Sequence, residues 1–340
     1  MRLGTISLWG GELVGFRRQL RLAEESGYDV VSVGDSPIGY HDLYVALAIA
    51  AHETRRPLLG PLVTAPFIRH PAVTAGAISS IDELSGGRAF LGIGTGGSVT
   101  KGIGRLAASQ REIRDYLVAV RSLLHGEQVT WEGSRIEPLV RARPVPIYYS
   151  ASGPRALALA GELADGVVLH VGSDLDAVRA KIAAVRAGAV AAGRDPGAID
   201  VWGYSYCAVR NSRAEALDDV KAFLASAGAF GMRPAHAMAA VPEHLKEKVR
   251  QLQQRYDVTQ HTVPGGGNAQ LVDELGLADF LAGRTTVAGS PAEVQDQVAG
   301  LAEAGIGTLF CALPGNADPE GTLVRFAAAA RPGATAAVED

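Results

Sequence analysis

A glycine-rich stretch, FLGIGTGGSVT at residues 90–100, has the residue types and spacing of a loop that could hold a phosphate. Gly92, Gly94 and Gly97 satisfy G-x-G-x-x-G, the pattern of dinucleotide-binding proteins. Glu112 follows close to where an acid that binds ribose would be sought. In such proteins the glycines join the first strand directly to a helix, whose amino terminus receives the pyrophosphate. Here they end the fourth expected strand and open no immediate helix, so we do not expect NAD binding.

A second candidate phosphate site is SASGPR, residues 150–155. Small residues lead there into an expected helix, with Pro154 near its first turn. Free backbone N–H groups and the positive end of the helix dipole would favour an anion, and Arg155 could add a charge-assisted contact. The alternative is an ordinary turn between a strand and a helix.

Four other side chains with chemical potential stand at the ends of expected strands. Asp35 ends the second strand, where a carboxylate could bind a cofactor, act as a general acid or simply cap a helix. His170 ends the sixth strand and could donate to a cofactor, titrate near neutral pH or be structural. Trp9 and Glu12 follow the first strand, where they would face substrate, although Trp9 could equally be core.

The chain supplies a regular scaffold for these residues, because short apolar runs alternate with amphipathic stretches. The expected strands are 2–9, 29–35, 58–65, 88–94, 145–152, 165–171, 198–210 and 306–313. The expected helices are 11–27, 41–54, 71–87, 109–126, 153–163, 174–193, 212–228 and 290–305, and 128–144 is expected to form a decorated turn or small hairpin.

The count and composition of these units predict the fold. Nearly continuous Val, Ile and Leu runs are typical of parallel strands covered on both faces, and eight units close a TIM barrel of this size. We therefore expect an α/β protein with a (β/α)8 TIM barrel as a single domain over 1–340. A doubly wound two-domain protein is the alternative, but no Pro/Gly/Ser-rich linker divides the chain. In a barrel the carboxyl ends of the strands form the active site, and glycines there would let a flat ligand approach the backbone.

Residues 229–285 interrupt the alternation between the seventh and eighth units. Within them, EHLKEKVRQLQQR (243–255) predicts a solvated amphipathic helix, and HTVPGGGN (261–268) is the most flexible-looking part of the chain. We expect this inserted helical region to be either a lid over the active site or an oligomer contact.

Composition excludes several classes of partner. The chain has 340 residues, 47% of them hydrophobic, and a formal net charge of −4 with acids and bases interleaved. A nucleic-acid partner is not expected, because no basic stripe is present. The amino terminus has no long apolar signal core, and no run approaches the ~20 apolar residues that span a bilayer. The sequence therefore predicts a soluble cytoplasmic protein without a membrane partner.

Other catalytic and metal-binding arrangements are not expected either. Cys207 and Cys311 each sit in an apolar run and are interpreted as core residues rather than a disulfide. His41, His52 and Glu53 are not joined to a third ligand, so no metal is predicted. No G-x-S-x-G joins a strand to a helix, so no nucleophile elbow is predicted.

A family resemblance rests on two long stretches. APFIRHPAVTAGAISSIDELSGGRAFLGIGTGG (65–97), followed by YYSASGPRALALAGELADGVVL (148–169), resembles the bacterial luciferase-like superfamily of TIM barrels that bind FMN or the deazaflavin coenzyme F420. Within it, the chain is most similar to the F420-dependent methylenetetrahydromethanopterin reductase branch. The resemblance weakens in 229–285 and implies an oxidoreductase, in many relatives a homodimer that pairs through the early helices.

The resemblance also implies roles for particular residues. It implies a cis peptide between Leu62 and Val63 behind the flavin-type ring, and an acid near Gly97 and Ser98, which this chain lacks. The implied cofactor-binding residues are Asp35, Ser36, Leu62, Val63, Thr64, Ala65, Gly94, Thr95, Gly96, Ser150, Ala151, Ser152, Gly153, Pro154, Arg155 and His170. Candidate catalytic residues are Asp35 and His170, and candidate substrate contacts are Trp9, Glu12, Ser98 and His261.

Three functions follow as hypotheses. The favoured one is F420-dependent hydride transfer to or from a small organic substrate at the barrel mouth, since the cofactor carries the chemistry and the barrel supplies orientation. The alternative is an FMN-dependent monooxygenase that uses reduced flavin and O2. The second alternative is a cofactor-free binding protein on a degenerate barrel.

Overall fold

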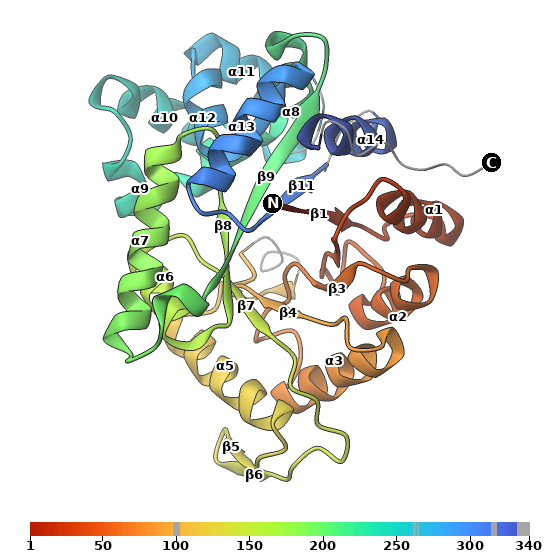
Figure 1. Cartoon of the computed structure of the whole chain (residues 1–340). Helices are drawn as coiled ribbons and strands as arrows, with labels where there is room; N and C mark the ends of the chain where they lie inside the picture. The colour runs from red at the N-terminus through yellow and green to blue at the C-terminus, as the bar shows by residue number, and fades with distance from the viewer. Residues whose placement is uncertain (98–102, 261–262, 264, 314–317, 332–340) are drawn as a thin grey trace, which may run out of the picture. The chain divides into compact units, whose positions relative to one another are not determined.

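The computed structural model describes residues 1–97, 103–260, 263, 265–313 and 318–331 (Figure 1). Its strands are β1 (Arg2–Ser7), β2 (Val30–Val33), β3 (Leu58–Pro61), β4 (Leu91–Ile93), β5 (Val129–Trp131), β6 (Ser134–Ile136), β7 (Ile147–Ser150), β8 (Gly166–His170), β9 (Asp200–Val209), β10 (Thr286–Gly289) and β11 (Thr308–Ala312). Its α-helices are α1 (Leu13–Glu25), α2 (Leu43–Glu53), α3 (Pro71–Ser85), α5 (Gln110–Leu124), α6 (Pro154–Leu163), α7 (Leu175–Ala191), α8 (Arg213–Ser226), α9 (Ala235–Ala239), α10 (Glu243–Arg255), α11 (Gly267–Leu275), α12 (Ala278–Thr285), α13 (Pro291–Glu303) and α14 (Pro319–Ala330).

The predicted alternation of strands and helices is confirmed. Each of the eight expected strands contains one observed strand, and each of the eight expected helices contains one observed helix. The expected hairpin is the antiparallel pair β5 and β6. Helix α10 has the bounds that the sequence predicts. Strand β10 and helix α14 were not expected from the sequence, whereas α9, α11 and α12 lie in the inserted region that was expected to be helical without individual bounds.

Helix boundaries follow from capping side chains. Ser109 accepts a hydrogen bond from the backbone N–H of Glu112, whose carboxylate accepts one from the backbone of Ser109. This reciprocal capping box starts α5 and satisfies two amides that the helix leaves unpaired. Ser290 and Glu293 start α13 in the same way. Glu112 is therefore a capping residue, and the idea that it could bind ribose is wrong.

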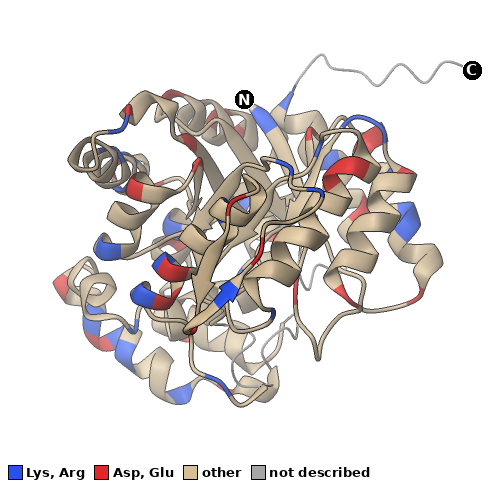
Figure 2. Cartoon of the chain, turned by 90° about the horizontal axis from the view of Figure 1, so that it is seen from below, with Lys and Arg blue, Asp and Glu red and all other residues tan. Residues whose placement is uncertain are grey.

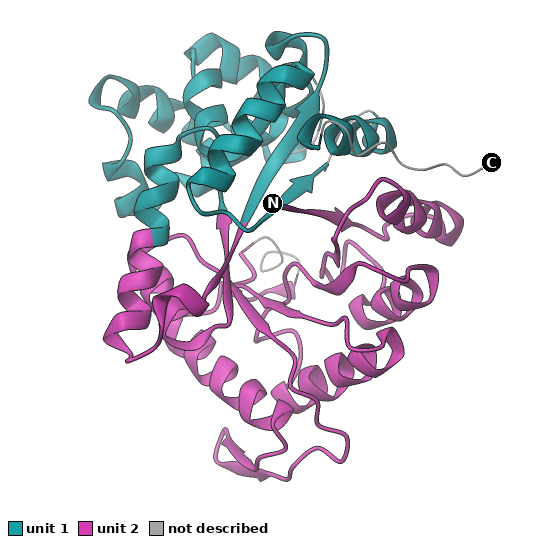
Figure 3. Ribbon diagram, in the orientation of Figure 1, with its two compact units in different colours: residues 1, 170–182, 203–340 teal, residues 2–169, 183–202 magenta. Residues whose placement is uncertain are grey.

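The chain divides into two compact units, coloured separately in Figure 3. Unit 2 comprises residues 2–169 and 183–202, and unit 1 comprises residues 1, 170–182 and 203–340. The expectation of a single domain over the whole chain stays a prediction.

Unit 2 contains six parallel strands in a continuous order. β1 pairs with β2 and β2 with β3, while β4 pairs with β7 and β7 with β8, all in parallel. Two bridges, Leu59 with Ala89 and Thr64 with Ile93, connect β3 to β4. Since all six strands run in one direction, their carboxyl ends lie along the same edge, where the predicted site residues of this unit stand.

Unit 1 contains β9, β10 and β11 with helices α8 to α14. β10 pairs with β9 in parallel, and β11 neighbours β9. The inserted region 229–285 is helical, as expected, and its helices have an apolar core in common with α8. That core includes Leu224 from α8, Leu252 from α10, Leu271 from α11 and Leu281 from α12. The insertion is thus a packed helical cluster, and its role as lid or oligomer contact stays a prediction.

Charged side chains are interspersed over the surface. Figure 2 shows Lys and Arg segments among Asp and Glu segments on the helices, and many of them form ion pairs, such as Arg255 with Glu274. Among the described residues, no helix is both long enough and apolar enough to cross a membrane.

The two cysteines lie on neighbouring strands, Cys207 on β9 and Cys311 on β11, and both are buried thiols without a disulfide. Burial, followed by a hydrogen bond with Cys311, raises the pKa of the Cys207 thiol. A protonated, buried thiol is a poor nucleophile, which agrees with the interpretation of both cysteines as core residues.

Candidate functional site

Thr64 connects the ends of three strands in unit 2. Its backbone N–H donates to the Gly92 carbonyl at 3.0 Å, and its carbonyl accepts from the Gly94 N–H at 2.9 Å. Its hydroxyl donates to Oδ2 of Asp35, which follows β2, at 2.6 Å. The predicted cofactor residues Asp35, Thr64 and Gly94 therefore lie together. Thr64 connects them by hydrogen bonds from its side chain and its backbone.

Asp35 is buried, and its carboxylate is ion-paired. Arg69, in the loop that leads to α3, donates from Nη1 to Oδ2 of Asp35 at 2.6 Å and from Nη2 to Oδ2 of Asp42 at 2.9 Å. The Asp35 side chain is 2% exposed and that of Arg69 14% exposed. Because Arg69 and Thr64 both donate to this carboxylate, the arrangement favours Asp35 as a hydrogen-bond acceptor over the general acid considered from the sequence.

The ion pairs between Arg69 and the two carboxylates shift the pKa values of Arg69 and Asp42. Burial alone would lower the pKa of Arg69, but hydrogen bonds and charge attraction from Asp35 and then Asp42 raise it above its usual value. Burial would likewise raise the pKa of Asp42, but the hydrogen bond from Arg69 and the backbone N–H groups of Val45 and Tyr44 lower it. The guanidinium and Asp42 are therefore both charged over the physiological pH range.

The glycines of residues 92–96 serve close packing. A Cβ added at Gly94 would lie 2.6 Å from Cγ2 of Val63, and one at Gly92 would overlap the Pro61 carbonyl. Gly96 has φ +72°, and a Cβ there would overlap the Phe67 ring. These glycines therefore have a packing role, since the atoms that they admit belong to the chain after β3, and their expected contact with a flat ligand stays a prediction. Gly94 also lies near Ser150, because a Cβ added at Gly94 would be 3.7 Å from Cβ of Ser150.

The peptide bond between Leu62 and Val63 is cis, so this expectation from the resemblance is confirmed. Leu62 and Ala65 are buried, and Val63 and Thr95 are half-buried. The Thr95 carbonyl accepts from the Ala108 N–H at 2.9 Å, which returns the chain towards α5.

The expected phosphate turn has the predicted form. Gly153 is the N-cap of α6 with φ −93° and ψ 160°, Pro154 is its first residue, and no side chain caps the helix. Ser152, Pro154 and Arg155 are exposed, whereas Ala151 is buried and donates its N–H to the Val168 carbonyl. The first turn of a helix leaves backbone N–H groups without partners within the helix, so α6 presents an anion-binding end here.

The side chains after β1 and β2 have mixed surroundings. Trp9 stacks on Phe16 at a ring-centroid distance of 5.5 Å and packs against the tilted His41 ring at 4.1 Å, and its buried Nε1 has no hydrogen-bond partner among the described residues. Glu12 is exposed at the N-cap of α1 without capping it. The Ser36 carbonyl accepts from the Gly39 and Tyr40 N–H groups and forms a turn.

His170 lies in unit 1 and is neutral. Burial first, then the charge of Lys181, lowers its pKa to about 3, and a hydrogen bond with the Thr285 backbone opposes this shift. The expectation that His170 could titrate near neutral pH is therefore wrong. Its Nε2 is buried without a partner, and the Tyr204 and Tyr206 rings pack edge-on at 5.1 and 5.2 Å. A neutral imidazole can still donate or accept one hydrogen bond.

Two other predicted contacts, Ser98 and His261, lie outside the described residues. Within the described ranges, no group of three or more His, Cys, Asp or Glu side chains is arranged to hold a metal ion.

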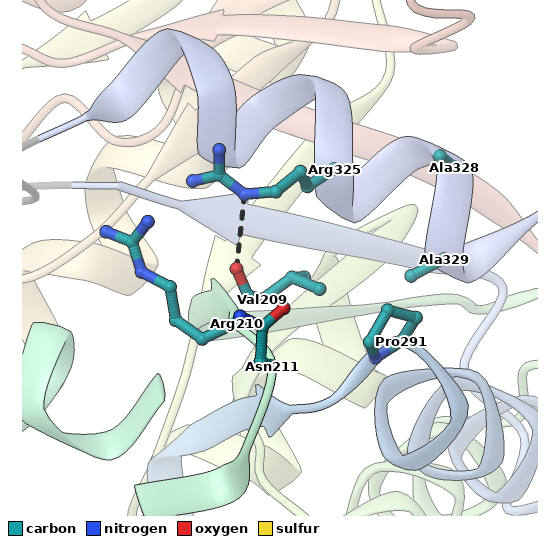
Figure 4. A pocket seen from close by; sticks show the side chains of 7 residues that line it. All are labelled: Val209, Arg210, Asn211, Pro291, Arg325, Ala328 and Ala329. Atoms are coloured by element: carbon teal, nitrogen blue, oxygen red, sulfur yellow. Dashed lines mark hydrogen bonds between the residues drawn. The ribbon is translucent and has the colours of Figure 1, made fainter. Parts of the chain in front are cut away.

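A cavity of about 380 Å³ in unit 1 involves none of the predicted site residues (Figure 4). It is lined by Val209, Arg210, Asn211, Pro291, Arg325, Ala328 and Ala329. Its arginines already pair with carboxylates, Arg210 with Asp219 at 2.6 Å and Arg325 with Asp318 at 3.0 Å. The cavity therefore offers no uncompensated charge to a ligand.

Sequence reasoning missed Arg69 and Asp42. Arg69 stands within the APFIRHPA stretch that carries the resemblance, yet no spacing rule pairs it with carboxylates 34 and 27 positions earlier. The available signal was weaker: an arginine just before a helix that begins with proline, in a chain whose second strand ends in an aspartate.

Comparison with known proteins agrees with this geometry. The chain matches the model of the family described as luciferase-like monooxygenase over residues 1–308. It is 36% identical over 203 residues to a 5,10-methylenetetrahydromethanopterin reductase of Methanolobus tindarius, a match covering 58% of this chain and 62% of that protein. It is 29% identical to the Archaeoglobus fulgidus enzyme of the same name, over 89% of this chain and 91% of that one.

The fold is also shared with a solved structure. The coenzyme F420-dependent tetrahydromethanopterin reductase of Methanopyrus kandleri superposes with a TM-score of 0.77 at 23% identity, covering 96% of this chain and 97% of that one. This likeness confirms the predicted TIM-barrel fold. The match of the family model over residues 1–308 shows that the chain belongs to the luciferase-like monooxygenase family, and this family together with the reductases named above shows that it is an oxidoreductase.

Proposed function

We propose that this chain is an F420-dependent oxidoreductase that transfers a hydride to or from a small organic substrate. The supporting observation is the row of strand ends in unit 2, where Asp35, Thr64, Gly94 and Ser150 stand side by side and lead to the uncapped amino terminus of α6. The F420-dependent reductase of Methanopyrus kandleri and the two methylenetetrahydromethanopterin reductases named above support the choice of F420.

The residues present fit such a cofactor at both of its ends. The backbone N–H groups of Gly153 and Arg155, at the start of α6, suit a phosphate, because the helix N-terminus adds a favourable dipole. The Asp35 carboxylate suits an N–H or O–H group of the ring end. The unpartnered Nε1 of Trp9, also in unit 2, is a buried donor that a bound molecule could satisfy.

The chemistry itself belongs to the cofactor: reduced F420 supplies a hydride, with its two electrons, to an electrophilic carbon such as that of a C=N, C=C or C=O group. The chain binds and orients. Thr64 orients the Asp35 carboxylate through its hydrogen bond, and Gly94, at the end of β4, packs closely against Val63. A rigid site keeps the reacting atoms in a productive geometry.

One other function is an outcome of the test. The family's description as monooxygenases supports FMN with O2 as the alternative cofactor chemistry, whereas the assignment as an oxidoreductase disfavours the cofactor-free binding protein considered from the sequence.

The test is redox turnover without oxygen. Purified protein is mixed with reduced F420 and, in turn, an imine, an activated alkene and a ketone, and oxidation of the deazaflavin is followed by its absorbance. We expect oxidation with one class at a rate well above that of the protein-free mixture. In a separate aerated mixture, oxygenated product formed from substrate with reduced FMN and O2 above the protein-free level, together with no reaction with F420, would support the monooxygenase instead.

A further inference from the structure

We propose that Arg69 is a positioning residue of this site, which acts on the ligand through Asp35 by holding its carboxylate in one orientation as a hydrogen-bond acceptor. This inference rests on the function proposed above and adds to it the group that sets the direction of the bound molecule.

Arg69 contacts two carboxylates, those of Asp35 and Asp42, each through a different guanidinium nitrogen. Nη1 donates to Asp35 at 2.6 Å and Nη2 to Asp42 at 2.9 Å. Asp42 is itself fixed, because its Oδ1 accepts the backbone N–H groups of Tyr44 and Val45 at the start of α2. Arg69 thus ties Asp35 to a helix N-terminus, and a lysine could not span both carboxylates with two planar donors.

Two further contacts fix Arg69, one at its guanidinium and one at its backbone carbonyl. The guanidinium lies over the Tyr44 ring, 5.1 Å from its centroid. The Arg69 carbonyl accepts from the hydroxyl of Tyr116 at 3.0 Å, and that hydroxyl lies 2.6 Å from Oγ1 of Thr74 on α3. The side chain therefore has one defined orientation before any ligand binds, which is the requirement for a preorganised contact.

The hydrogen bonds leave one oxygen of Asp35 for a ligand. Oδ2 accepts from Thr64 and from Arg69, both at 2.6 Å, whereas among the described residues Oδ1 has only a long 3.5 Å contact with Nη2 of Arg69. Two carboxylates and one guanidinium leave the cluster with a net negative charge. This charge repels phosphate and favours a donor group, so the cluster directs the N–H or O–H edge of the ligand to Asp35 and leaves its anionic end for α6.

The first test uses the protein without cofactor. Thermal unfolding is compared for wild type, R69M, D35N and the double variant R69M/D35N. Removing Arg69 alone strands a buried carboxylate, so we expect R69M to lower Tm by roughly 6 °C or more. The double variant should regain at least half of that loss, because it removes the stranded charge. Equal losses in R69M and R69M/D35N would overturn the claim that Arg69 acts through Asp35.

The second test measures F420 affinity in the same variants, with R143M as the matched control. Arg143 makes a comparable ion pair with Asp82 on α3, at 2.5 Å, at residues assigned no part in the site. We expect R69M and D35N each to weaken binding at least tenfold, the double variant to bind no worse than the weaker single variant, and R143M to stay within twofold of wild type. R69K should recover part of the loss.

Three outcomes would overturn the proposal for distinct reasons. If wild type binds F420 and folded R69M binds it equally well, Arg69 is only structural. If losses multiply in the double variant, Arg69 does not act through Asp35. If wild type binds no F420 at all, the proposed function and the ligand role fail together, while the unfolding data still decide whether Arg69 and Asp35 are coupled.

Discussion

The substitution Gly153→Asp separates helix stability from anion binding at α6. Gly153 is the N-cap of that helix with extended backbone angles, φ −93° and ψ 160°, which are those of a capping residue. An aspartate is among the best residues at this position and is more favourable than glycine by only a few tenths of a kcal/mol. The variant should therefore fold with an unchanged or slightly raised Tm.

Its effect on F420 binding should be large. The aspartate takes the N–H groups that a phosphate would use, and one charge-assisted hydrogen bond is worth about 1.5–3 kcal/mol. Repulsion between two negative charges at contact adds about 1–4 kcal/mol, depending on solvent exposure. A loss of about 3 kcal/mol or more corresponds to at least a hundredfold increase in Kd.

The assay is a fluorescence titration of wild type, G153D and G153N with F420. Asparagine has the same shape without the charge, so G153N should lose less affinity than G153D, and the difference should shrink at high salt. A folded G153D that binds F420 as tightly as wild type would refute the assignment of the phosphate to this turn.

Three further outcomes test other parts of the structure. Gly94→Ala should lower the free energy of unfolding by about 1–3 kcal/mol in urea denaturation, because its Cβ would meet Val63, and V63A should recover part of that loss. Gly97→Ala is the control and should leave stability unchanged, because the space around Gly97 is open. Equal effects of the two substitutions would contradict the packing role of Gly94. Glu112→Ala should lower stability by about 0.5–1 kcal/mol and leave F420 affinity unchanged, whereas loss of binding would contradict its capping role. The pKa of His170 is about 3 in the folded protein and near 6.5 in the unfolded chain, so the unfolded state binds the proton more readily. The free energy of unfolding should therefore fall as pH drops below 6.5, by about 2 kcal/mol at pH 5. A His170→Gln variant with the same pH dependence as wild type would show that another group is responsible.

Much of the fold was predictable because it depends on local pattern. Apolar runs predicted every strand of the eight-unit alternation, and the amphipathic pattern of 243–255 predicted the bounds of α10. β10 was missed because the four residues TVAG give a weak signal next to a helix cap. The form of the turn at 150–155 was predictable for the same reason, since a proline at N1 and small residues before it are local features, and its phosphate binding stays a proposal.

The surroundings of the site residues depend on contacts that are distant in sequence. The packing role of the glycines depends on Pro61, Val63 and Phe67, whose close approach no spacing rule predicts, and the expected contact with a ligand stays a prediction. The protonation of His170 depends on burial and on Lys181, eleven residues away along another element. The role of Asp35 likewise depends on Arg69.

The most direct test of the central claim is equilibrium titration of the purified wild-type protein with F420 and, separately, FMN, each in oxidised and reduced form, followed by absorbance and fluorescence. The account predicts saturable F420 binding with an affinity at least tenfold higher than that for FMN. Tighter binding of FMN would contradict the choice of cofactor, and binding of neither would contradict the proposed oxidoreductase site.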